Sequence, residues 1–346
     1  MQIGLFDEER RLEKLSEKGD SLEKLNQVIE WETFRPILEK AVPRSNGKKG
    51  GRPPFDHILM LKILILKRIY NLGDDALEYQ ILDRLSWMRF LGLHSIKEVP
   101  DAKTIWLFQD MLSKTDAGRE LFMAFNRQME EAHLITHTGT IVDATFVDAP
   151  RQHNTREENA KVKEGEVPQE WDKPEQKAKR SQKDTDAWWS RKYGEMHYGY
   201  KDHIKADRDS KLIRDYVVTA ANVGDGPVMP EMIDADDHNL YADSAYCGKN
   251  TKSESLRKMA EDGKLCINEQ QFRNRRLTEE QKRNNRIYAK IRCRVEHIFG
   301  FMSGAMHGLT LRTIGMQRAK HQIAMLNLTY NLCRYVYLKR ILPAEG

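Results

Sequence analysis

Residues 138–148 read Thr-Gly-Thr-Ile-Val-Asp-Ala-Thr-Phe-Val-Asp. This alternation of β-branched side chains with small or polar ones predicts a β-strand. On its N-terminal side, residues 55–95 carry apolar side chains at helical spacing, which predicts helices. The chain is therefore expected to have an all-helical N-terminal domain, residues 1–135, followed by a mixed domain, residues 136–346.

Strand and helix patterns alternate through the mixed domain. Residues 151–192 interrupt them, because twenty of these 42 residues are charged and aliphatic side chains are nearly absent. Such a segment cannot bury enough apolar surface to order itself, so we expect a polar surface insertion or a mobile loop. Strands are predicted at 197–206, 212–222, 239–242 and 264–268, a turn and short helix at 224–235, and helices at 252–262, 279–302 and 316–338. This order is that of an α/β, ribonuclease-H-like fold.

Composition gives a soluble protein with a mild positive excess. Hydrophobic residues make up 40% of the 346 residues, and the formal net charge is +5. The longest apolar run, residues 58–66, is too short for a bilayer span, so we expect a core helix there and no membrane partner. Acidic residues at positions 7–9 argue against a signal peptide, which favours a cytoplasmic protein. Four cysteines, in no zinc-like spacing, are expected to be reduced thiols: Cys247, Cys266, Cys293 and Cys333.

Asp143 is a charged residue in the middle of the first predicted strand. A carboxylate inside an apolar strand is costly unless it has a partner or a metal ion. Side chains alternate along a strand, so Asp148 points to the opposite face, and we choose Asp143 as the site residue. The alternative is an aspartate that merely bonds a neighbouring loop.

Asp243 follows the short strand Leu-Tyr-Ala and precedes a turn of small residues. The carboxyl ends of strands are where open α/β sheets place their ligands. The alternative is a helix N-cap. A cluster of acids just upstream is interpreted as a solvated turn before the strand: Asp234, Asp236 and Asp237, with His238.

Glu296 lies towards the end of a strongly basic predicted helix. Between Arg273 and Arg294 there are nine Lys or Arg residues and two acids. Arg292 is four residues before Glu296, hence on the same helix face. The pair could be a simple helix ion pair. Alternatively, Glu296 could join the two aspartates around divalent metal, since two-metal phosphodiester chemistry needs converging carboxylates.

Three motifs in order resemble the DDE signature of bacterial insertion-sequence transposases, most closely the group named for insertion sequence five. They are Asp143 in its strand, Asp243 in YADSAY and Glu296 in RCRVEHIFG. Residues 51–93 resemble that group's N-terminal helical domain, and HYGYKDHIKAD resembles its second core strand. The similarity runs from about residue 20 to 338.

The resemblance implies an enzyme that binds the terminal inverted repeats of an insertion sequence and catalyses metal-dependent DNA cleavage and strand transfer. It implies Mg²⁺, replaceable by Mn²⁺, held by Asp143, Asp243 and Glu296. One departure is Ser303, where the group commonly has a basic residue two turns after the glutamate. The alternatives are a nuclease on the same fold without strand transfer, and a domesticated, inactive DNA-binding protein.

Several basic and aromatic residues are candidates for contacts with double-stranded DNA. Lys48, Lys49 and Arg52 precede two prolines and resemble an AT-hook, although a basic linker has the same composition. Trp188 and Trp189, among basic residues, could stack on unpaired bases or pack the insertion onto the core. Phosphate contacts are expected from Arg275, Arg276, Arg286 and Arg292.

Joining two element ends implies a homodimer, at least on DNA. The expected location is the bacterial cytoplasm, in association with the nucleoid.

Overall fold

The computed structural model describes residues 7–43, 53–192, 194–234, 237–246, 254–271 and 276–341. Its contacts divide the chain into two units, residues 1–125 with 324–346, and residues 126–323. Two helices, α8 (Ala117–Glu131) and α13 (Met316–Ile341), contribute to both units. The candidate DNA-binding residues Lys48, Lys49, Arg52 and Arg275 lie outside the described residues.

The first unit is helical throughout its described N-terminal part, as the apolar periodicity predicts. Its central helix, α4, is buried on most of its circumference, and Asp56 caps it by accepting hydrogen bonds from the amides of Ile58 and Leu59. No helix in the described part of the chain is both long enough and apolar enough to cross a membrane. The elements are α1 (Asp7–Glu17), α2 (Ser21–Val28), η1 (Trp31–Phe34), α3 (Arg35–Ala41), α4 (His57–Ile69), α5 (Asp74–Asp83), α6 (Leu85–Leu91), η2 (Ile96–Glu98) and α7 (Ala102–Ser113).

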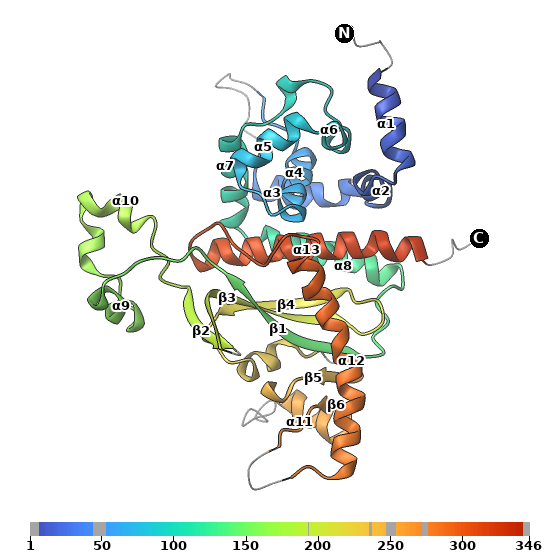
Figure 1. The fold of residues 1–346 in the computed structure, drawn as a ribbon, viewed down its shortest axis with the longest axis vertical. Helices are drawn as coiled ribbons and strands as arrows, with labels where there is room; N and C mark the ends of the chain where they lie inside the picture. The colour runs from blue at the N-terminus through green and yellow to red at the C-terminus, as the bar shows by residue number, and fades with distance from the viewer. Residues whose placement is uncertain are drawn as a thin grey trace. The chain divides into compact units, whose positions relative to one another are not determined.

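The second unit is built on a mixed six-stranded sheet with β1 in its middle (Figure 1). The order is β2-β3-β1-β5-β6, and β4 pairs with β3 beside β2. β3 is antiparallel to β1, β2 and β4, whereas β5 is parallel to β1 and β6 is parallel to β5. The strands are β1 (Thr140–Asp148), β2 (Trp188–Lys192), β3 (Glu195–Asp207), β4 (Ile213–Ala220), β5 (Leu240–Ala242) and β6 (Leu265–Ile267). All the predicted strands are present, and β2 is an additional one.

One face of this sheet packs on a core of Val142, Met229, Leu240 and Leu256 with further apolar residues. These come from β1 and β5, from η5 (Gly226–Met232), and from α11 (Glu254–Glu261). The segment predicted as a turn and a short helix is thus a 3₁₀-helix. A further 3₁₀-helix, η6 (Ser244–Tyr246), follows β5 directly.

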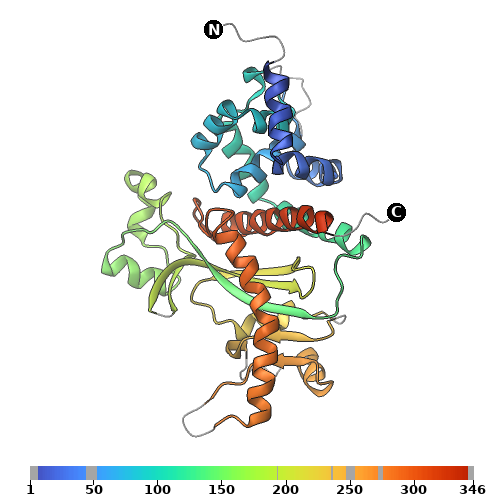
Figure 2. The same cartoon turned by 45° about the vertical axis from the view of Figure 1, so that its right-hand side comes forward.

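The long helix α12 (Glu279–Ser303) runs along β1, β5 and β6 (Figures 1 and 2). Its first turn is fixed by a capping box, in which Thr278 and Gln281 bond each other's backbone amides. Val295, Ile298 and Met302 form its buried stripe. This spacing turns one face of the helix to the sheet and sets the position of every side chain on that face.

The segment expected to form a polar surface insertion or a mobile loop contains short helices and a strand. It contains α9 (Arg156–Lys163), η3 (Gln169–Asp172), η4 (Pro174–Gln176) and α10 (Lys177–Arg180), followed by β2. Trp171 is fully buried and donates its indole N–H to Glu158, at 2.8 Å. Glu158 also accepts from Lys179, at 2.5 Å. One tryptophan and hydrogen bonds to a charged group therefore replace the aliphatic core that the segment lacks.

Candidate active site

Asp143 lies in the middle of β1, opposite Ile204 of β3, and faces α12. One carboxylate oxygen accepts the amide N–H of Ala144 at 2.8 Å. Burial raises the pKa of Asp143 above its ordinary value, and the Ala144 amide and the Arg292 guanidinium oppose that rise. The strand therefore holds this carboxylate in a partly dry position where a positive charge nearby stabilises its ionised form.

Asp243 directly follows β5, the strand parallel to β1. Its Oδ1 accepts the amide N–H of Ser244 at 2.6 Å and the Ser244 hydroxyl at 3.2 Å. Its side chain is 40% exposed, against 20% for Asp143. The turn thus fixes one oxygen of Asp243 and leaves the carboxylate open to solvent.

Arg292 of α12 joins the two aspartates. Its Nη2 lies 3.4 Å from Oδ2 of Asp143, and its Nη1 lies 3.4 Å from Oδ1 of Asp243. Three elements far apart in the sequence, β1, the end of β5 and α12, thereby converge at one point. Two carboxylates that face one guanidinium mark a point that favours positive charge.

Tyr246, which the sequence analysis did not single out, belongs to the same cluster. It is buried, and its hydroxyl makes no hydrogen bond within the described part of the chain. Burial raises the pKa of Tyr246 well above its ordinary value, and the charges of Asp143, Asp225 and Asp243 act in the same direction. The signal that could have found it is its position in the small-residue turn after Asp243.

Glu296 lies one turn after Arg292 on α12, with its side chain exposed. The contacts of the described residues do not join it to Asp143 or Asp243. Ser303 donates its hydroxyl to the carbonyl of Gly300 at 3.3 Å and is exposed at the helix end. The structure thus brings two of the three candidate acids together and places the third on the adjoining helix turn.

The donor set fits a hard divalent ion in its chemistry. Carboxylate oxygens are the ligands that Mg²⁺ and Mn²⁺ prefer, and the buried Tyr246 hydroxyl, which has no hydrogen-bond partner among the described residues, feels the charges of both aspartates. Among the described residues, no group of three or more His, Cys, Asp or Glu side chains is arranged to hold a metal ion. The fit therefore rests on Asp143 and Asp243, which share the Arg292 guanidinium, and Glu296 lies one helix turn after that arginine.

Two neighbouring acids lie outside this cluster. Asp148 contacts His197, at 3.4 Å between Oδ1 and Nδ1. The interpretation of the upstream acids as a solvated turn is wrong for Asp237. It is buried between Lys205, at 2.6 Å, and Arg214, at 2.8 Å. The two cations come from β3 and β4, so their pairing with Asp237 could not be predicted from local sequence.

The other candidate residues lie at several places. Arg276 is exposed just before α12, and Arg286 is exposed within the helix. Trp188 and Trp189 lie near the C-terminal end of the insertion, in β2, which pairs with β3. Arg292 is engaged by the two aspartates, so a contact with DNA would require it to share its guanidinium.

Two family models match the chain. Residues 135–332, more than half of the chain, match the family model described as a transposase DDE domain. Residues 10–111 match a second family model, described as a transposase domain (DUF772). No solved structure matches the chain.

Proposed function

Because this chain belongs to the DDE transposase family, we propose that it binds the terminal inverted repeats of an insertion sequence and there cuts and rejoins DNA. Enzymes of this type catalyse metal-dependent DNA cleavage and transfer. The observation that carries the proposal is the convergence of Asp143 and Asp243 on one guanidinium at 3.4 Å each. The three motifs around Asp143, Asp243 and Glu296 support placing the element in the group named for insertion sequence five.

Asp143, Asp243 and Glu296 are proposed to hold the divalent ion, with Mg²⁺ as the natural choice and Mn²⁺ as a substitute. A bound ion of this kind activates the attacking oxygen and stabilises charge on the leaving oxygen. Asp143 would supply a ligand from a partly buried position, and Asp243 would supply one from a position more open to solvent. No side chain of the protein is needed as a nucleophile in this mechanism.

Basic residues are proposed to bind the DNA backbone around this centre. Arg286 is exposed on α12, the helix that carries Arg292 and Glu296, and Arg276 is exposed in the segment just before this helix. Contacts of these guanidinium groups with phosphates position the duplex without reading its sequence. Arg275 is proposed to join them, and Lys48, Lys49 and Arg52 are proposed to contact an A·T-rich minor groove.

The domain roles follow from the same argument. We propose that residues 1–135 bind the element ends and that residues 136–346 catalyse the reaction on a ribonuclease-H-like fold. Support for that fold is the sheet itself, since three antiparallel strands, β4, β3 and β1, continue into the parallel strands β5 and β6. The acids lie in the central strand and at the end of its parallel neighbour.

The test is to incubate the protein with its element's end DNA and Mg²⁺ and to map the products. We expect nicks at the element ends that leave 3′-hydroxyl groups, followed by molecules in which these ends are joined to target DNA. Nicks without joined products would contradict strand transfer and assign an ordinary nuclease. Neither product, from a protein that binds the end DNA, would contradict catalysis altogether.

A further inference from the structure

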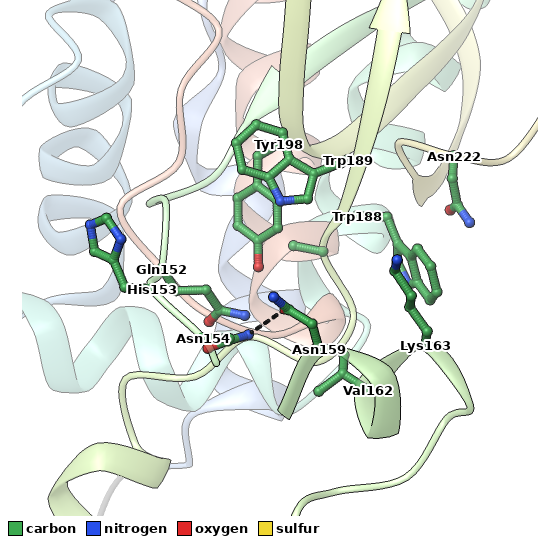
Figure 3. Close-up of a pocket in the computed structure, with 11 residues that line it drawn as sticks. Gln152, His153, Asn154, Asn159, Val162, Lys163, Trp188, Trp189, Tyr198 and Asn222 are labelled. Atoms are coloured by element: carbon green, nitrogen blue, oxygen red, sulfur yellow. Dashed lines mark hydrogen bonds between the residues drawn. The ribbon is translucent and has the colours of Figure 1, made fainter. Parts of the chain in front are cut away.

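A pocket of about 580 Å³ lies in the insertion, apart from the carboxylate cluster (Figure 3). It is bounded by α9, by the segment after β1, and by β2 and β3. This volume is within the range of sites that bind small molecules. Neither the carboxylates nor the exposed arginines of α12 line it, so the proposed function does not explain it.

Aromatic side chains form one side of the pocket. Trp189 and Tyr198 lie with ring centroids 5.0 Å apart at an interplanar angle of 42°, and Trp188 also lines the pocket (Figure 3). Trp189 is 46% exposed. The Arg151 guanidinium lies 5.5 Å from its ring centroid. A tryptophan left open to solvent beside a pocket is a stacking surface for a planar ligand.

Amide groups and one lysine also line the pocket. Asn154 donates its amide N–H to the oxygen of Asn159 at 3.2 Å (Figure 3). That bond leaves the amide nitrogen of Asn159 and both amide atoms of Asn222 without a hydrogen-bond partner among the described residues. Amides pair with the donor and acceptor edges of bases. Lys163, which is exposed at the same pocket, can meet a phosphate.

Hydrogen bonds hold the pocket in shape before any ligand enters. The side-chain amide of Gln152 makes two bonds to the backbone of Asp184, each of 2.7 Å. α9 is fixed by the bonds of Glu158 to Trp171 and Lys179. β2 is fixed by its pairing with β3. A preformed site binds without an ordering cost.

We propose that this pocket takes one unstacked nucleobase of the DNA on which the enzyme acts. The base stacks on Trp189, the free amides of Asn159 and Asn222 meet its edge, and Lys163 and Arg151 contact its phosphate. Tyr198 is six residues along β3 from Ile204, the partner of Asp143 in the sheet, which is at most about 20 Å of extended strand. The inference rests on the proposed function only for its choice of DNA as the source of the base.

The test is a binding assay in EDTA, in which cleavage does not occur. The probe is a short duplex with one unpaired 2-aminopurine, compared with the same duplex fully paired. We expect the unpaired probe to bind about tenfold more tightly, because stacking one base on an aromatic side chain is worth on the order of 1–3 kcal/mol. Its 2-aminopurine fluorescence should be quenched on binding. Equal affinity for both duplexes would overturn the proposal.

Variants assign the effect to the pocket. Trp189→Ala and Asn159→Asp should both lose the preference for the unpaired probe. Trp106→Ala should keep it, since Trp106 of α7 is also 46% exposed but lies outside the pocket. A preference retained by Trp189→Ala and Asn159→Asp would overturn the proposal. Because Asn159 is an exposed side chain, its variant tests the pocket even if Trp189→Ala does not fold.

Two further measurements are needed. One distinguishes DNA from a free nucleotide as the source of the base, and the other distinguishes the base pocket from the proposed catalytic function. Free dAMP should compete with the unpaired probe only weakly. If free dAMP bound as tightly as the unpaired probe, the pocket would be a site for free nucleotides and the proposal of a DNA base would be overturned. Asp143→Ala should keep the preference. If the wild-type protein prefers the unpaired probe but never cleaves DNA, the proposed catalysis is contradicted and the base pocket is still supported.

Discussion

Asp143, Asp243 and Glu296 make different contacts, although the proposal gives them one task. Replacing each by alanine should reduce cleavage by at least about 1,000-fold, because a lost metal ligand removes several kcal/mol of transition-state stabilisation. Affinity for end DNA should change little, since it comes mainly from basic residues. Gel-based cleavage and binding assays measure both. Asp148→Ala, on the same strand, is the matched control, and near-normal cleavage by any of the three variants would remove that residue from the site.

Arg292 is the residue whose role the structure alters most. It supplies the positive charge between Asp143 and Asp243, so a divalent ion near these carboxylates must approach a guanidinium. Arg292→Gln should therefore bind Mn²⁺ about tenfold more tightly, since a nearby unit charge costs the ion more than about 1 kcal/mol at an effective dielectric constant of about 20. Calorimetric titration with Mn²⁺ measures this without DNA. Arg286→Gln is the control, and weaker binding by Arg292→Gln would show that the arginine positions the ligands instead.

Among the elements, strand β3 carries a buried histidine with a consequence for pH. His203 is fully buried, 2.9 Å from the Thr219 hydroxyl and 3.8 Å from Asp225, with Lys201 nearby. Burial lowers the pKa of His203 from 6.5 to about 4. As the pH falls, the unfolded chain therefore protonates at this histidine before the folded chain does. The resulting stabilisation is complete above pH 6.5 and is lost as the pH falls towards 4.

The full loss amounts to about 3 kcal/mol, since each pKa unit is worth about 1.4 kcal/mol. Urea unfolding at a series of pH values should show this decline in the wild type and a smaller one in His203→Gln. His153→Gln, an exposed histidine, should follow the wild type. A decline of the same size in His203→Gln would assign the acid sensitivity to other groups.

The helices and strands also show which secondary structure can be predicted from local sequence patterns. β1, β3, β4 and α12 follow from side-chain periodicity, which depends on residues within one turn or one strand. β2 does not, because Trp-Trp-Ser-Arg-Lys becomes a strand by pairing with residues 195–199. The order in the insertion likewise depends on one buried tryptophan, Trp171, and on Glu158, which accepts its N–H.

On the scale of the whole molecule, the same distinction applies to the site. Asp143 and Asp243 could be selected because each stands at a recognisable place along its own strand. Their common partner, Arg292, is 149 residues from Asp143. Such a contact arises from the packing of α12 on the sheet, which local sequence does not encode. Tyr246 stands in the small-residue turn after Asp243, but its interaction with the charges of Asp143 and Arg292 also depends on packing, so the turn alone did not identify it.

The last prediction concerns the number of chains in an active assembly. An element has two ends, and one carboxylate site serves one strand exchange at a time. A single chain would have to release one end before acting on the other, whereas two chains in a twofold arrangement each hold one. We therefore expect light scattering of the protein with end DNA to give two protomers and two ends. Asp143→Ala should form the same complex.

Mixing active and inactive subunits sharpens this test. With equal amounts of wild type and Asp143→Ala, products joined at both ends should fall to about a quarter, the fraction of twofold assemblies that contain two active subunits. Products joined at one end should fall less, because one active subunit suffices for them. If both products fell to the same fraction, one chain would be acting at both ends. A complex of one protomer with one end that still joined both ends would lead to the same conclusion.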